Sequence, residues 1–133
     1  WRGGDYAGIG PGAHSRLTDN NCFIATYQIH DPARWLAAVE KSGCGTGKRH
    51  ILDGRERAEE ILMTGLRLVK GLDTKGLFEA TGFSLSTLTD ADRLRQAVNG
   101  GLLVNDGNYL RTTTAGRIIL NTLVGAILTT TKA

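Results

Sequence analysis

Apolar residues recur at the spacing of α-helices through the second half of the chain. Between positions 55 and 70 they stand at Ala58, Ile61, Leu62, Gly65, Leu66, Leu68 and Val69. This period places them on one face of a helix, which Gly71 would end. Asp73 and Asp90 each precede a further apolar segment and can cap its first turn. Three helices are therefore predicted before Gly100.

A β-hairpin and a last helix follow. Two short apolar runs, 102–104 and 109–112, flank the turn Asn105-Asp106-Gly107-Asn108, a pattern typical of a hairpin. Thr113 or Thr114 can cap a final helix whose apolar residues continue to Leu128. Three helices, a hairpin and a helix form the order of a winged helix. Residues 55–133 are therefore predicted to form a helical, winged-helix-like domain.

The first part of the chain combines strands with one helix. Residues 6–10 are apolar and predict a buried strand, 11–15 a loop, and 22–29 a second strand. Asp31 and Pro32 favour the start of a helix that ends near Gly43. The polar stretch 43–54 is interpreted as a linker between residues 1–42 and 55–133. The predicted fold class is α+β, mainly helical with few strands.

Charge and hydropathy exclude several classes of function. Lys and Arg total 16 against 13 Asp and Glu, and the net charge of +3 is not gathered into a basic block. Acidic residues head the third helix and occupy the hairpin turn, which argues against nucleic acid as a partner. No apolar stretch reaches the roughly 18 residues of a membrane span, and the first five residues lack the apolar region of a signal peptide. The first residue is Trp1, so we expect a piece cut from a longer protein.

The two cysteines, Cys22 and Cys44, allow a disulfide but favour reduced, buried thiols of a cytoplasmic protein. Two cysteines without a close histidine pair cannot hold a structural zinc ion or an iron–sulfur cluster by themselves. The three histidines lack metal-ligand spacing as well. No metal site and no catalytic residue is therefore predicted on this chain.

The best candidate for a binding site is the segment that follows the first predicted strand. Gly8, Gly10 and Gly12 resemble a phosphate-binding loop, but no helix start follows and Pro11 removes one amide donor. A tight turn is the favoured interpretation, with the backbone passing close to another group, a ligand included. His14 follows the strand, where α/β proteins often place functional side chains, although a hydrogen-bonded loop histidine is the competing interpretation. Gly12, Ala13 and His14 are the candidate binding residues; His30 and His50 receive no role.

Four motifs together resemble one known family. They are GGDYAGIGPGAHS at 3–15 after Trp1, Asp31-Pro32 leading to Trp35-Leu36, RAEEILMTGLRL at 57–68 and LRTTTAGR at 110–117. The sequence is similar to the C-terminal region of radical S-adenosylmethionine (SAM) proteins related to oxygen-independent coproporphyrinogen III oxidase, closest to the heme chaperone subgroup HemW. The resemblance implies that 1–42 are the last strand and flank of a truncated radical SAM barrel. Residues 55–133 would be the domain that covers the mouth of that barrel.

The resemblance also sets limits on function. The cluster motif C-x-x-x-C-x-x-C is absent, so the chain itself is expected to be non-catalytic and without a cofactor of its own. The longer protein would carry a 4Fe–4S cluster and S-adenosylmethionine, with heme left open as a further ligand. Its partners would be the missing N-terminal barrel and a porphyrin or heme.

Three functional hypotheses remain. In the family's true oxidases an apolar residue near S-adenosylmethionine stands where this chain has His14, which favours a heme chaperone. In that subgroup Trp1 would end the motif H-N-x-x-Y-W. The first alternative is a domain of a genuine coproporphyrinogen oxidase, and the second is a free-standing winged-helix module that binds nucleic acid. Without its barrel, the chain is also expected to self-associate through strand edges near residues 6–9.

Overall fold

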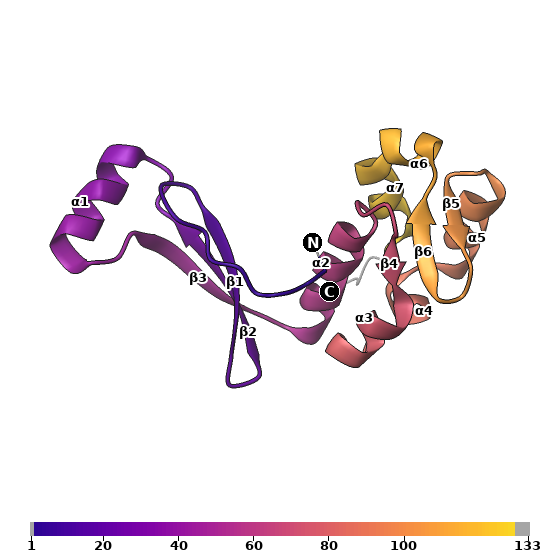
Figure 1. The fold of residues 1–133 in the computed structure, drawn as a ribbon, viewed down its shortest axis with the longest axis horizontal. Coiled ribbons are helices and arrows are strands. Elements are labelled where there is room, and N and C mark those ends of the chain that lie inside the picture. Colours follow the sequence, from indigo (N-terminus) through magenta and orange to yellow (C-terminus); the bar gives the residue numbers. More distant parts are fainter. Residues whose placement is uncertain (1, 130–133) are drawn as a thin grey trace. The chain divides into compact units, whose positions relative to one another are not determined.

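The computed structural model describes residues 2–129 and divides them into two compact units (Figure 1). One unit comprises residues 4–53, and the other comprises residues 2–3 with 54–129. Among these residues, none of the helices is long and apolar enough to cross a membrane.

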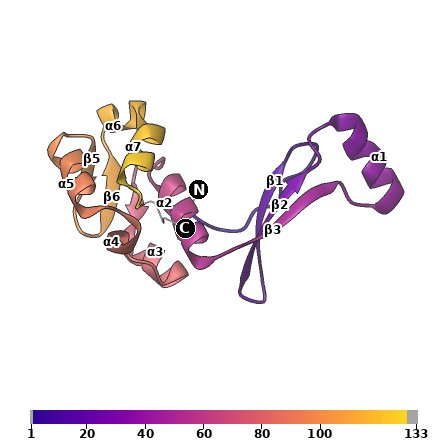
Figure 2. The same ribbon diagram turned by 180° about the vertical axis from the view of Figure 1, so that it is seen from behind.

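The unit 4–53 is built on an antiparallel sheet of three strands in the order β1-β2-β3 (Figure 2). The strands are β1 (His14–Asp19), β2 (Cys22–Gln28) and β3 (Thr46–Leu52). Asn20 and Asn21 form a two-residue turn between β1 and β2 with φ of 46° and 63°. Both values suit a primed hairpin turn, in which asparagine is tolerated. The strand predicted over 22–29 is confirmed.

Helix α1 (Pro32–Ser42) follows β2, as the sequence predicts. The Asp31 carboxylate accepts a hydrogen bond from the Arg34 amide at 2.8 Å, and Gly43 ends the helix with a φ of 73°. No residue of α1 is buried, although the Trp35 indole nitrogen donates to the Gln28 side chain at 3.0 Å. A single polar contact therefore helps to attach this helix to β2.

Two predictions for this unit are wrong. Residues 6–10 are not a buried strand: Tyr6 makes one isolated bridge to Arg16, and Ile9 is 92% exposed. The predicted linker 43–54 contains β3, and the division between the units falls at Asp53 and Gly54. Strand β3 is polar because it is an edge strand with six of its seven residues exposed, so it lacks the alternation that marks a half-buried strand.

The second unit contains the predicted winged-helix order. Its elements are α2 (Gly54–Gly65), β4 (Leu72–Asp73), α3 (Thr74–Thr81), α4 (Leu85–Leu88), α5 (Ala91–Asn99), β5 (Leu103–Asn105), β6 (Tyr109–Thr112), α6 (Thr114–Ile118) and α7 (Leu120–Ile127). Asp73, Asp90 and Thr113 cap α3, α5 and α6 as predicted, each accepting from an amide three residues later. The α+β fold class is confirmed.

Leucines from nearly every element form one core in this unit. Leu62, Leu66, Leu77, Leu88 and Leu110 are fully buried there. The hairpin strand β6 pairs with both β5 and β4, so the wing joins a third, two-residue strand in the sheet order β4-β6-β5. Strand β4 and the short helix α4 were not predicted from the sequence.

Two helices are shorter than predicted. Helix α2 ends at Gly65, and Val69 is 81% exposed in the turn that follows. The final helix is broken at Ile119 into α6 and α7, and Ile118 is 82% exposed. Gly116 of α6 packs against the Leu102 carbonyl oxygen, whereas α7 buries four residues in the core. Because of the break, α6 can pack against Leu102 while α7 packs in the core.

Candidate functional site

Gly8 brings the glycine-rich segment against the start of β1. A Cβ on Gly8 would overlap the His14 carbonyl oxygen, and the Gly8 amide donates to the Ser15 hydroxyl at 3.0 Å. The group that the backbone passes so closely is therefore the backbone of His14. This contact supports the interpretation of the segment as a tight turn.

Gly12 and Ala13 have no amide available to cradle a phosphate or carboxylate. The Gly12 amide donates to the Ile29 carbonyl at 3.0 Å, and the Ala13 amide donates to Gly10 at 3.3 Å. The Ala13 carbonyl accepts from the Gln28 amide at 2.8 Å. Neither amide is therefore available to an anionic ligand.

His14 is not in a loop; it is the first residue of β1 and lies opposite Tyr27 of β2. Its exposed imidazole stands edge-on to the Tyr27 ring, with ring centroids 4.7 Å apart and an interplanar angle of 71°. Aromatic pairs favour this arrangement. The imidazole is therefore held in a defined orientation while it stays accessible.

Two cations flank the same tyrosine. The Arg16 guanidinium carbon lies 5.6 Å and the Lys48 ammonium 5.9 Å from the centroid of the Tyr27 ring. Arg16 stands two residues from His14 on β1, and Lys48 pairs with Tyr27 from β3. The sheet register thus places these side chains on one face. We call His14, Arg16, Tyr27 and Lys48 the Tyr27 cluster.

The Tyr27 cluster has the chemistry to hold a flat, anionic ligand. An imidazole nitrogen can coordinate heme iron, and Arg16 and Lys48 can pair with propionates. The tyrosine ring offers an apolar surface beside them. The residues present therefore fit heme.

An iron–sulfur cluster does not fit this chain. The sequence contains two cysteines, one fewer than the motif of the family requires. Residues 2–129 contain no group of three or more His, Cys, Asp or Glu side chains that could hold a metal ion. Trp1, the expected end of the family's histidine motif, lies outside the described residues.

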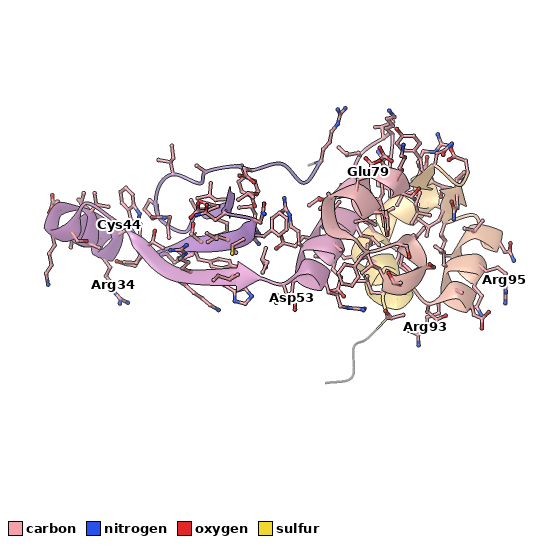
Figure 3. The ribbon with its side chains drawn as sticks, turned by 90° about the horizontal axis from the view of Figure 1, so that it is seen from below. Arg34, Cys44, Asp53, Glu79, Arg93 and Arg95 are labelled. Carbon is pink, nitrogen blue, oxygen red and sulfur yellow. The ribbon has the colours of Figure 1, made fainter. Side chains whose placement is uncertain are left out.

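Both cysteines are exposed and free, which corrects the expectation of buried thiols. Cys22 begins β2, and Cys44 lies in the connection from α1 to β3 (Figure 3). The Thr46 side chain and amide hydrogen-bond the Cys44 thiol and lower its pKa. Gly43 ends α1 with a φ of 73°, and Cys44 follows it as an exposed residue.

The winged-helix unit is poorly equipped to bind DNA. Arg93 and Arg95 extend outward from α5 (Figure 3), but Arg95 pairs with Asp92, and Arg93 donates to the Ala126 carbonyl at 3.1 Å. In the wing, Arg111 pairs with Asp106 at 3.1 Å. These cations are engaged within the chain, so a phosphate backbone would have to displace their partners.

Residues 52–119, more than half of the chain, match the family model of the HemN C-terminal domain. The chain belongs to the HemN C-terminal domain family. The matched segment covers β-strand residue Leu52, the helices α2 to α5, and the wing through α6. Radical SAM proteins of the HemN and HemW type thus share the winged-helix unit.

Relatives match nearly the full length of the chain. The radical S-adenosyl methionine domain-containing protein 1, mitochondrial, of Danio rerio is 29% identical over 96% of this chain and 30% of its own length. Heme chaperone HemW of Buchnera aphidicola is 29% identical over 96% of this chain and 32% of its own length. The chain therefore spans about a third of these relatives.

A solved structure shows the same fold. The coproporphyrinogen III oxidase HemN of Escherichia coli superimposes with a TM-score of 0.67 at 16% identity. The match covers 92% of this chain and 28% of the oxidase. The part of the oxidase that matches therefore has the same fold as most of this chain.

Proposed function

We propose that the chain is the C-terminal region of a heme chaperone of the HemW type. The observation that supports this is the Tyr27 cluster, in which an accessible histidine stands among two cations and an aromatic ring. Two of the relatives are named heme chaperone HemW, which also supports this proposal. The family resemblance implies an apolar residue at this position in true porphyrin oxidases, so His14 favours the chaperone over the oxidase.

In this proposal the residues of the cluster have separate roles. The His14 imidazole would hold the heme iron through a ring nitrogen. Arg16 and Lys48 attract the propionates, while the Tyr27 ring orients the imidazole and supports the porphyrin edge. Gly12 and Ala13 contribute carbon atoms to the rim, because their amides already donate within the chain.

The remaining partners belong to the longer protein. The unit 4–53, with its sheet β1-β2-β3, would complete the edge of a radical SAM barrel, and the winged-helix unit would cover its mouth. The 4Fe–4S cluster and S-adenosylmethionine would be bound by that barrel. The free thiols suit a cytoplasmic protein, since reducing compartments keep thiols unpaired.

The propionate contacts can be tested by titrating the chain with hemin at low salt and recording the Soret band. Replacing Lys48→Glu should weaken binding about fivefold, because an exposed ion pair contributes up to ~1 kcal/mol. Lys75→Glu is the matched control, since Lys75 lies on α3 and pairs with Glu79 at 3.6 Å. Equal affinity of the Lys48 variant and the unmodified chain would refute the role of this lysine.

The two alternatives predict other outcomes. If the longer protein is an oxidase, it will convert coproporphyrinogen III anaerobically when given S-adenosylmethionine and a reductant; a chaperone will not. A nucleic-acid-binding module would retard duplex DNA at low salt and release it steeply as salt rises. Absence of a gel shift at low salt would remove that alternative.

A further inference from the structure

A cavity lies in the winged-helix unit, between α2, α3, β4 and β6. Its volume is about 390 Å³. Pockets that hold small ligands typically measure about 300–1,000 Å³. It lies in a different unit from the Tyr27 cluster and has no part in the heme proposal.

The floor of this cavity is apolar. Ile61, Leu72 and Leu77 line it, with exposures of 8%, 2% and 1%. These side chains belong to α2, β4 and α3, which are packed in the core. The floor is therefore already formed, and an apolar ligand would displace water from it without rearranging the fold.

Cations outnumber anions in the lining. Arg2 and Lys70 contribute positive charge, and Asp73 contributes one carboxylate. Asp73 is engaged in capping α3, since its carboxylate accepts from the Gly76 amide at 3.0 Å. The Lys70 ammonium lies 4.7 Å from the centroid of the Tyr109 ring, a cation–π contact that holds it against the cavity wall.

We propose that this cavity binds a small molecule with an apolar chain and one carboxylate. The apolar floor would take the chain, and Lys70 with Arg2 would pair with the carboxylate. One anionic group matches the single excess positive charge of the lining. The second negative charge of a dianion would lie near the Asp73 carboxylate and would have no cation in the lining to pair with.

The test uses decanoate, below the concentration at which it forms micelles, titrated into the 133-residue chain. Calorimetry should show one saturable site, and amide shifts should concentrate at Lys70, Gly71 and Gly76. Decanol should bind at least about tenfold more weakly. Its hydroxyl is neutral, and a hydrogen bond between two charged groups contributes more binding free energy than one that involves a neutral group. No saturation, or equal binding of decanol, would overturn the proposal.

Two variants test the assignment of residues. Lys70→Glu should weaken decanoate binding about tenfold or more, and Lys75→Glu, outside the cavity, should leave it unchanged. Ala80→Phe should abolish binding by filling the cavity from an exposed helix position, while the thermal midpoint stays near that of the unmodified chain. Unchanged affinity in either the Lys70 or the Ala80 variant would refute this site.

Discussion

The Cys44 thiol illustrates how one neighbour sets the chemistry of an exposed residue. The Thr46 side chain hydrogen-bonds the sulfur, and the Thr46 amide lies 3.5 Å from it, which together lower the pKa of the thiol. Thiolate therefore forms at a lower pH than in an ordinary cysteine. Thr46→Val should raise the pH midpoint of Cys44 alkylation, measured by mass spectrometry across a pH series.

Thr26→Val is a suitable control, because Thr26 is a strand threonine of β2 that pairs with Ser15 and Arg49. It should leave the alkylation midpoint where it is. If Thr46→Val also leaves the midpoint unchanged, the hydroxyl has no influence on the thiol.

Single residues were predictable where their partners are close in sequence. Asp31, Asp73 and Asp90 each cap an amide three positions ahead, so the residue type and the following apolar pattern were enough. The Tyr27 cluster was not predictable beyond His14, because Lys48 reaches Tyr27 only through the register of β2 and β3. Assigning 43–54 to a linker concealed that register.

Among the elements, the turn of the wing contains a carboxylate, Asp106, that accepts hydrogen bonds from two backbone amides. The Tyr109 amide hydrogen-bonds Asp106, as does the Asn108 amide, and with the Arg111 guanidinium they keep the pKa of that carboxyl low. The stabilisation is therefore present above the ordinary pKa of aspartate and is lost as the pH falls through the lowered value. Acid should loosen the hairpin turn before the helices.

Asp106→Ala should remove this acid sensitivity. The protection factor of the Tyr109 amide, which corrects the exchange rate for its intrinsic pH dependence, should be lower in the variant at neutral pH and should no longer fall on acidification. Asp92→Ala, which removes an exposed carboxylate from α5, is the control and should preserve the response. Equal Tyr109 exchange in the unmodified chain and the Asp106 variant would contradict the role of this carboxylate.

Whole elements were predictable where period and caps agree. Helices α3 and α5 and the hairpin lie where the sequence places them, because each has an apolar pattern and a turn or cap at its boundary. The final helix was predicted as one because Ile118 and Ile119 continue the apolar pattern, yet both are exposed. The break depends on Gly116 meeting Leu102, a contact that local sequence does not reveal.

For the molecule as a whole, exposed apolar side chains predict association between copies. In the unit 4–53, Tyr6 is 52%, Ile9 92% and Ile51 59% exposed, and β1 and β3 are the outer strands of the described sheet. Exposed apolar residues beside an open strand edge favour pairing with another chain. Light scattering should therefore detect dimers or larger species as the concentration rises.

Ile9→Lys should shift the population toward the monomer by placing a charge in that surface. Ile118→Lys, at a position 82% exposed in the other unit, is the matched control and should have little effect. A strictly monomeric chain at high concentration would contradict the prediction. An equal effect of both variants would show that association does not depend on the residues near Tyr6 and Ile9.

The heme-binding proposal depends most directly on His14. The decisive measurement is the Soret spectrum of the chain during a hemin titration, compared with His14→Ala and with His50→Ala. His50 lies on β3, opposite Ala25, and supplies a matched histidine in the same sheet. We predict a saturable Soret shift that is lost in His14→Ala and retained in His50→Ala. No saturable shift, or a shift that survives the loss of His14, would contradict the assignment of a heme ligand to this domain.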